Sequence, residues 1–328
     1  MINSLKFILS IQLKRSGINK TISGFTLIEL LVGLIMAILV ITPLLAFMIN
    51  ILDSDRKEQA KATSEQEIQA ALDYIARDLQ QAVYVYDADG LTRIADTTTI
   101  SNSGIKDQIP PLKSASSCNP TSGSNPSVCT PILVFWKREL ITNSVKINPT
   151  SDTSDAQTDD GFAYSLIAYY LITNPNKTNS TWSQEARIGR FQLRGPVNAP
   201  NTTVNTTDTG FNPPPLNKSG ATLKNKMNQW QTALGASASY TQRVETLIDY
   251  ISTTAPSSTP CSSPNLVGSQ NSGFFACVDA NEVLAQVYIR GNALARLQNN
   301  NLAYSTNTKT YFPSGSIRVQ GRGFLFTK

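Results

Sequence analysis

Residues 24–40, GFTLIELLVGLIMAILV, decide the fold, because they open an apolar run that extends to Ile51 without any lysine or arginine. A basic, polar segment precedes the run, and a strongly charged segment follows it. At about 1.5 Å per residue, a helix over 25–51 is roughly 40 Å long, which exceeds the hydrocarbon core of a bilayer at about 30 Å. The sequence therefore predicts one membrane-spanning helix, with a single carboxylate, Glu29, near its start.

The charges around this run predict its orientation. The basic residues before it are Lys6, Lys14, Arg15 and Lys20, and no acidic residue accompanies them. By the positive-inside rule, the N-terminus is cytoplasmic, and the chain after the span lies on the other side of the membrane. An ordinary secretory signal fits less well, because the run is long and no small-residue cleavage site follows it. Without residues 1–24, the net charge of +5 falls close to neutral, so we expect no nucleic-acid binding.

Residues 52–90 predict an amphipathic helical stem. Its apolar side chains recur every three or four residues and form one stripe: Ile68, Leu72, Ile75, Leu79, Val83 and Tyr86. We expect one helix from Phe25 to about Tyr86, ended by Asp87, Asp89 and Gly90, with its second half packed on a globular domain. Pro43 lacks a backbone N–H and is expected to kink the first half.

Residues 91–328 predict a β-rich globular domain. Apolar or alternating segments that read as strands are 131–140, 161–172, 186–195, 274–278, 282–291 and 315–326, and 243–252 reads as strand or helix. These features predict an α+β fold, in which a long N-terminal helix packs on an antiparallel sheet. Long loops are expected near 96–130, 143–160, 196–230 and 252–273.

Four cysteines fall into two local pairs, Cys118 with Cys129 and Cys261 with Cys277. Each pair brackets a loop rich in small polar residues, and the chain has no histidine to complete a zinc site. We predict two disulfides formed in an oxidising compartment, each stabilising by about 2–4 kcal/mol. Four free or partly buried thiols are the alternative.

Candidate chemistry is sparse. Without histidine, a Ser-His-Asp or Cys-His catalytic site is impossible, so we expect no enzyme and no cofactor. A loop carrying Asp152, Asp155, Asp159 and Asp160 is a weak calcium candidate, because calcium prefers oxygen ligands. Its spacing does not match an EF-hand, and a solvated loop is the favoured interpretation.

Arginines and aromatic residues suggest possible contacts with a partner. The arginines that could contact an acidic polysaccharide or an acidic partner are Arg187, Arg190, Arg194, Arg290, Arg296, Arg318 and Arg322. The aromatic residues that could stack on sugars are Trp136, Trp182, Trp230, Tyr169 and Tyr170. The plainer alternatives are ordinary surface charge and core packing.

The segment SGFTLIELLVGLIMAIL, residues 23–39, resembles the class III signal of type IV pilins and type II secretion pseudopilins. The resemblance implies a leader peptide over 1–24, removed after Gly24 by a membrane aspartyl prepilin peptidase, and N-methylation of Phe25. It also implies that Glu29 neutralises the N-terminal amine of a neighbouring subunit during assembly. A signal-anchor helix with a stray acid is the alternative.

The rest of the chain extends this resemblance. Residues 68–87, IQAALDYIARDLQQAVYVYD, look like the stem of larger minor pseudopilins of the J-type and W-type. Six further segments are similar to the C-type hormogonium polysaccharide secretion pseudopilins of filamentous cyanobacteria: 134–140, 164–172, 187–195, 274–279, 285–296 and 311–324.

This likeness implies a minor pseudopilin, a structural subunit of a fibre that supports polysaccharide secretion and gliding motility. The implied partners are other major and minor pseudopilins and an inner-membrane assembly platform. A pilus-displayed adhesin or glycan-binding subunit is the main alternative. A membrane-anchored enzyme, for which the stem is only a tether, has less support.

Overall fold

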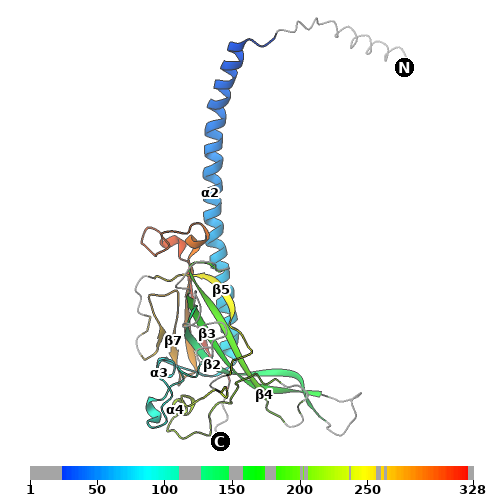
Figure 1. Cartoon of the computed structure of the whole chain (residues 1–328), viewed down its shortest axis with the longest axis vertical. Coiled ribbons are helices and arrows are strands. Elements are labelled where there is room, and N and C mark those ends of the chain that lie inside the picture. Colours follow the sequence, from blue (N-terminus) through cyan, green and yellow to red (C-terminus); the bar gives the residue numbers. More distant parts are fainter. Residues whose placement is uncertain are drawn as a thin grey trace, which may run out of the picture. The chain divides into compact units, whose positions relative to one another are not determined.

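The computed structural model describes residues 24–110, 127–147, 158–173, 182–199, 202, 206–235, 238–255, 260–261 and 264–323. The chain divides into two compact units between Asp55 and Arg56. Helix α2 (Leu27–Gln80) contributes its first part to one unit and its second part to the other (Figure 1). The expected leader lies outside the described residues except for Gly24.

The first unit is the apolar part of α2. Every residue from Gly24 to Arg56 is exposed, and the apolar residues lie on all sides of the helix. The helix is long and apolar enough to cross a membrane, and it is the one such helix among the described residues. The predicted span over 25–51 thus lies within α2 except for its first two residues, Phe25 and Thr26.

Helix α2 ends six residues earlier than its apolar stripe predicts. After Gln80 the chain forms strand β1 (Ala82–Val85), which pairs antiparallel with strand β2 (Val128–Lys146). The prediction of a helix to about Tyr86 is wrong because the β-branched and aromatic residues of β1 gain strand partners that a single helix lacks. Asp87 does not end the long helix but caps the short helix α3 (Ala88–Thr92), accepting a hydrogen bond from Gly90 N at 3.1 Å.

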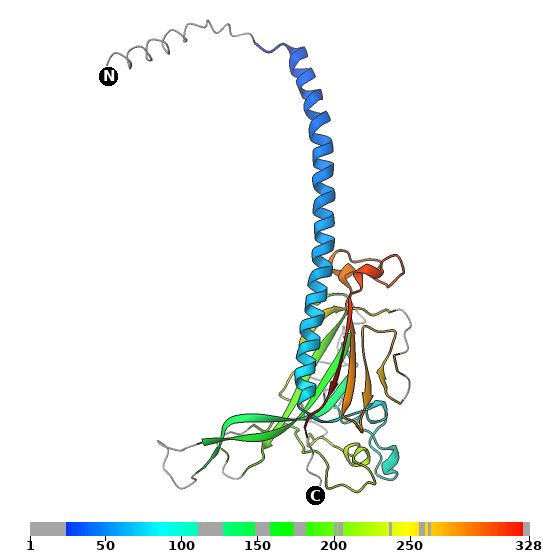
Figure 2. The ribbon, with the colours of Figure 1, turned by 180° about the vertical axis from the view of Figure 1, so that it is seen from behind.

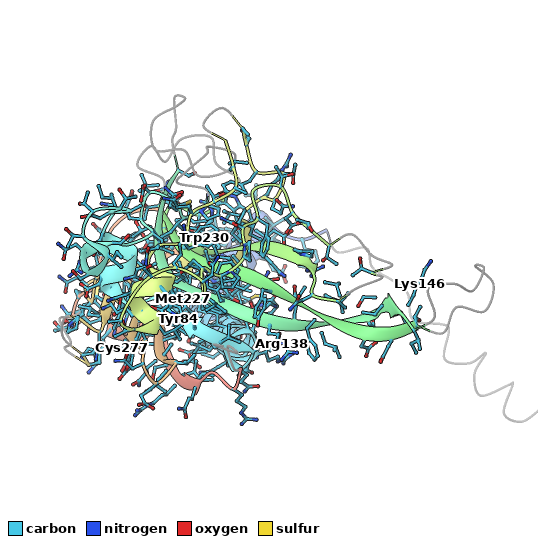
Figure 3. All side chains as sticks on the ribbon, turned by 90° about the horizontal axis from the view of Figure 1, so that it is seen from below. Tyr84, Arg138, Lys146, Met227, Trp230 and Cys277 are labelled. Atoms are coloured by element: carbon cyan, nitrogen blue, oxygen red, sulfur yellow. A yellow bond between two sulfur atoms is a disulfide. The ribbon has the colours of Figure 1, made fainter. Side chains whose placement is uncertain are left out.

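Five antiparallel strands in the order β1-β2-β3-β4-β5 form the larger sheet. The further strands are β3 (Thr158–Thr173), β4 (Ala186–Val197) and β5 (Glu245–Ile251). Strands predicted at 131–140, 161–172 and 186–195 are confirmed, and the ambiguous segment 243–252 is a strand. The ends of β2 and β3 leave the body as a two-stranded ribbon, with Lys146 far from Trp230 (Figure 3).

Four antiparallel strands form a second sheet in the order β6-β7-β8-β9. They are β6 (Leu266–Gly268), β7 (Phe274–Asp279), β8 (Leu284–Arg290) and β9 (Ser314–Gln320). The expectation of a single sheet is therefore corrected to two. In the described part of the chain the two sheets meet at an isolated bridge between Ile251 and Gly291. Two backbone hydrogen bonds lie beside it, from Ser252 N to Arg290 O at 3.0 Å and from Asn292 N to Tyr250 O at 2.7 Å.

The second part of α2 packs its stripe into a core that both sheets share (Figure 2). Ile68, Leu72, Ile75 and Leu79 are all at most 2% exposed. Strand β9 approaches this stripe closely at Gly315, where an added Cβ would lie 2.7 Å from Leu72 Cδ1. A larger residue at this position would force the Leu72 side chain to move, so glycine allows the close approach of strand and helix.

Some of the expected loops are anchored by small elements. Helix α4 (Leu223–Met227) and the 3₁₀ helix η1 (Ile100–Asn102) lie in two of these loops. The 3₁₀ helices η2 (Ala293–Arg296) and η3 (Lys309–Tyr311) lie instead in the connection between β8 and β9, which was not among the expected loops. Trp230, just after α4, is fully buried and packs edge-to-face on Trp136 with ring centroids 5.8 Å apart. This contact fixes the long connection between β4 and β5 to the sheet.

A disulfide joins Cys261 to Cys277, with the two Cα atoms 6.0 Å apart, and ties the segment before β6 to strand β7. Cys129 lies buried in β2 and is disulfide-bonded. Its predicted partner, Cys118, lies outside the described residues.

Candidate functional site

The first turn of α2 presents the residues of the cleavage-like motif. Gly24, Phe25 and Thr26 precede the helix, and Thr26 caps it: its carbonyl accepts from Glu29 N at 3.0 Å and from Leu30 N at 3.2 Å. The Thr26 hydroxyl accepts a longer bond from Glu29 N at 3.4 Å. Thr-x-x-Glu at this position is the capping-box pattern, so the local sequence explains why the helix begins here.

Glu29 therefore lies in the first helical turn, exposed and four residues after Phe25. Its carboxylate makes no ion pair within the described residues. A carboxylate near a helix N-terminus is favourable by about 0.3–1 kcal/mol in water. In lipid, however, an unpaired charge costs a few kcal/mol, so a cation from outside the described chain would stabilise Glu29 in a bilayer.

The apolar segment behind Glu29 continues through Pro43 without a break in the helix. Proline cannot donate to the carbonyl of Leu39, and the preceding Thr42 hydroxyl donates to Ile38 O at 2.7 Å. Helix α2 is thus continuous through Pro43, with one backbone hydrogen bond missing. The kink expected there stays a prediction.

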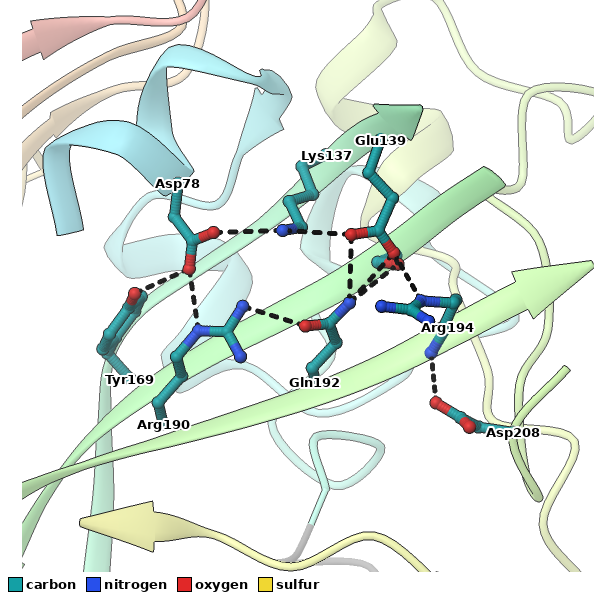
Figure 4. A network of polar contacts seen from close by, with 9 residues as sticks. Asp78, Lys137, Glu139, Tyr169, Arg190, Gln192, Arg194 and Asp208 are labelled. Carbon is teal, nitrogen blue, oxygen red and sulfur yellow. Dashed lines mark hydrogen bonds and ion pairs between the residues drawn. The ribbon is translucent and has the colours of Figure 1, made fainter. Parts of the chain in front are cut away.

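The other end of α2 carries a buried acid, Asp78, only 8% exposed. Its two oxygens accept hydrogen bonds from Lys137 Nζ at 3.0 Å, Tyr169 Oη at 2.7 Å and Arg190 Nε at 2.8 Å (Figure 4). These partners come from β2, β3 and β4. The helix end is therefore fastened to three neighbouring strands by charge-assisted bonds.

A second carboxylate, Glu139 on β2, continues the network. It accepts from Ser165 Oγ at 2.6 Å and Arg194 Nε at 2.7 Å, and Lys137 Nζ lies 3.2 Å away (Figure 4). Lys137 thus bridges both carboxylates. Gln192 links the two halves, donating to Glu139 and accepting from Arg190 at 2.9 Å each.

Burial and neighbouring charges shift the pKa values of these carboxylates in opposite directions. Burial alone would raise the pKa of Asp78, but the Arg190 hydrogen bond and the Lys137 charge hold that pKa below its ordinary value. The pKa of Glu139 is likewise lowered, since Ser165, Lys137 and Arg194 outweigh burial. Burial raises the pKa of Asp208, whose carboxylate accepts from Arg194 N at 2.6 Å.

The network around Asp78 and Glu139, called the lock below, has a structural role. Its carboxylates are ionised at neutral pH and saturated with donors, so neither is poised to exchange a proton. Its chemistry is to hold the end of α2 in one register on the sheet. Arg190 and Arg194, considered in the sequence as contacts for an acidic ligand, are used here instead.

No known family model, curated protein or solved structure matches the chain. The pilin-like interpretation therefore depends on the motif of residues 23–39 and on the properties of α2.

Other predicted arginines occupy different positions. Arg187 is buried beside Trp182, with its guanidinium carbon 5.5 Å from the ring centroid. Arg296 pairs with Glu67 and donates to Ser64 Oγ at 3.1 Å, binding η2 to α2. Arg318 and Arg322 are exposed. Arg290 lines a cavity on the second sheet.

The aromatic candidates are mostly core residues. Trp136, Trp230, Tyr169 and Tyr170 are fully buried, and only Trp182, at 44%, is exposed. Stacking of sugars on the first four is thereby excluded in the folded unit.

Only two of the four aspartates proposed as calcium ligands lie within the described residues. Asp159 and Asp160 are exposed near the start of β3, and Asp160 accepts from Asn143 N at 3.0 Å. Asp152 and Asp155 lie outside the described residues. Within the described ranges, no group of three or more potential ligands could hold a metal ion.

The lock around Asp78 was missed in the sequence, although a signal exists. Asp78 lies next to Leu79 of the apolar stripe, and Lys137 directly follows the apolar run 131–136 of its strand. A charge beside each of two apolar segments is costly if it is buried alone and indicates a pair.

Proposed function

We propose that this chain is a minor pseudopilin, a structural subunit inserted in the inner membrane through residues 25–51. The observation that carries the proposal is that the first part of α2 is apolar on all sides and wholly exposed, with one acid in its first turn. The proposed processing is cleavage after Gly24 and methylation of Phe25. The proposed partners are a prepilin peptidase, sibling pseudopilins and an assembly platform.

The energetics of the helix support a lipid or helix-bundle environment. Leu27 is 87% exposed and Phe47 64%. Burying one such side chain stabilises by about 1.5–3 kcal/mol, so a whole segment of them is unstable in water without an outside partner. Lipid satisfies this demand in the free subunit, and neighbouring helices satisfy it in a fibre.

Glu29 supplies the register in this proposal. Cleavage after Gly24 creates an ammonium on Phe25, and a neighbouring subunit's ammonium is the cation that pairs with Glu29. Two subunits then dock where the charges meet, because every other offset leaves a charge unpaired in lipid. Helix capping is the rival role for Glu29 and needs no neighbour.

Two substitutions separate these roles. Glu29→Gln keeps a side chain that can complete the capping box but has no charge, whereas Glu29→Ala removes both. Pairing with an ammonium predicts that both variants insert in the membrane and that both lose cross-linking to neighbouring subunits at least tenfold. Glu65→Gln, an exposed acid of the same helix, is the matched control and should assemble normally.

Two results would contradict the proposal. One is normal cross-linking of Glu29→Gln together with failure of Glu29→Ala, which would assign a capping role. The other is a native polypeptide whose mass shows that it begins at Met1 rather than at methylated Phe25.

The finer assignment, to a fibre that supports surface-polysaccharide secretion and gliding motility, rests on the resemblance of the strand segments. Deletion of the gene should abolish secreted polysaccharide and gliding together if the assignment is right. Loss of protein secretion with normal polysaccharide would instead favour a general type II secretion role.

A further inference from the structure

The outer face of the second sheet holds a cavity of about 240 Å³ that the proposed function does not use. Side chains alternate along a strand, so Tyr288 and Arg290 of β8 share this face with Phe275 of β7 and with Ser314 and Ser316 of β9. The opposite face carries the buried core residues Val287 and Ile289. The cavity is therefore separate from the helix interface.

Arg290 is the distinctive group of this cavity. It is half-buried, and its guanidinium makes no ion pair or hydrogen bond within the described residues. By contrast, Arg190, Arg194 and Arg296 each have a carboxylate partner. Burial lowers the pKa of Arg290 below its ordinary value, which reflects a desolvated charge without a counterion. Such a group gains most from an incoming anion.

The other walls indicate more than a simple anion. Phe275 and Tyr288 form a stacked pair, with ring centroids 4.7 Å apart and planes at 8°. Ser314 and Ser316 have hydroxyls without partners among the described residues. Ser272 Oγ lies 2.7 Å from Ser269 O and 2.9 Å from Phe274 O, and these two carbonyls compete for its single proton, so toward a ligand it can only accept.

These groups match one ligand class. A cation suits a carboxylate, the ring wall suits an apolar C–H surface, and hydroxyls that donate and accept suit ligand hydroxyls. We propose that the cavity binds a sugar acid, either free or as one residue of a longer glycan, with its carboxylate on Arg290. The volume lies below the roughly 300–1,000 Å³ of typical ligand pockets, so a single sugar ring fills it.

Calorimetry on the full-length chain tests the site, in a polyoxyethylene detergent that carries no sugar headgroup. The titrants are sodium glucuronate, neutral glucose and inorganic phosphate, at matched ionic strength. Glucuronate should bind at least tenfold more tightly than glucose or phosphate. Arg290→Gln should weaken glucuronate binding roughly tenfold, which corresponds to about 1.4 kcal/mol.

Arg318→Gln is the matched control. Arg318 lies on the same face of β9 but outside the cavity, so its loss should change the affinity less than twofold. Arg290→Gln should keep the unfolding temperature of the parent, because Arg290 has no described partner to lose. The double variant Ser314→Ala/Ser316→Ala should weaken glucuronate several-fold and keeps the test decisive if Arg290→Gln misfolds.

Four outcomes would overturn the proposal. They are no heat with glucuronate, equal binding of glucose, phosphate binding as tight as glucuronate, and equal losses in Arg290→Gln and Arg318→Gln. Phosphate preference would assign a plain oxyanion site, and equal losses would assign a general surface-charge effect. The pseudopilin proposal survives any of these, since it depends on α2 and Glu29.

Discussion

The two parts of helix α2 have the same backbone conformation but opposite relations to their surroundings. Between Leu27 and Leu52 the helix is apolar all round and exposed. Between Arg56 and Gln80 it is polar on one side and buries a stripe at Ile68, Leu72, Ile75 and Leu79. One chain thus carries a helix that needs an outside solvent or partner beside one that is completed by its own fold.

The comparison extends to charge. Glu29 has no described cation, whereas Asp78 has Lys137 and Arg190. A missing cation at one end and two saturating cations at the other indicate different roles for the two acids. Asp78 stabilises the fold, whereas the proposed role of Glu29 is to pair with a neighbouring chain. Substitutions along α2 should separate these roles.

The largest effect is expected for Asp78→Ala. It leaves Lys137 and Arg190 without this buried counterion, which costs about 3–5 kcal/mol of the free energy of unfolding. Urea unfolding followed by the fluorescence of Trp136 and Trp230 measures it. Asp73→Ala, an exposed acid on the same helix, should stay within about 0.5 kcal/mol. Equal effects of the two variants would contradict the lock.

The second effect concerns apolar side chains. Ile75→Ala removes a fully buried side chain and should cost about 2–5 kcal/mol in the same unfolding measurement. Ile35→Ala removes an exposed one, 49% accessible, and should leave that transition unchanged. A loss of stability in Ile35→Ala would show that the two parts of α2 are not independent.

The smallest expected effect is a dependence of the free energy of unfolding on pH. The pKa values of Asp78 and Glu139 lie below the ordinary 3.8 and 4.5, so the folded unit binds fewer protons there than the unfolded chain. The stabilisation is thus present above about pH 5 and is lost as the pH falls through the lowered pKa values. The raised pKa of Asp208 acts oppositely and offsets part of the loss.

A substitution tests whether Asp78 causes this pH dependence of the free energy of unfolding. Asp78→Asn should flatten the decline of the unfolding free energy between about pH 5 and pH 2, whereas Asp73→Asn should leave it unchanged. An unaltered slope in Asp78→Asn would place the acid sensitivity elsewhere.

Much of the fold was predictable because its signals are local. The long helix, its stripe and most strands follow from periodicity over short windows. The Cys261–Cys277 disulfide follows from a short spacing around a polar loop. The end of α2 was not predictable in this way, because Val83 and Tyr86 fit the helical stripe as well as a strand. Pairing with Trp136 and Phe135, some fifty residues away, decided it.

The candidate sites divide in the same manner. Glu29 stands out in the sequence because it is the one acid in an apolar run. Arg290 does not, since seven arginines on or beside the strands look alike in one dimension. Only the contacts of Arg190, Arg194 and Arg296 with carboxylates separate them from Arg290.

The sequence by itself determined that an apolar helix precedes a β-rich body and that the first turn of this helix carries an acid next to its cap. Hydrophobic period and chain-local capping need no distant partner, so they can be read directly. Tertiary structure alone decided the division into two sheets, the lock at Asp78 and the lack of a described counterion for the half-buried Arg290. Each depends on which distant side chains meet, and that choice is made by packing rather than by local preference.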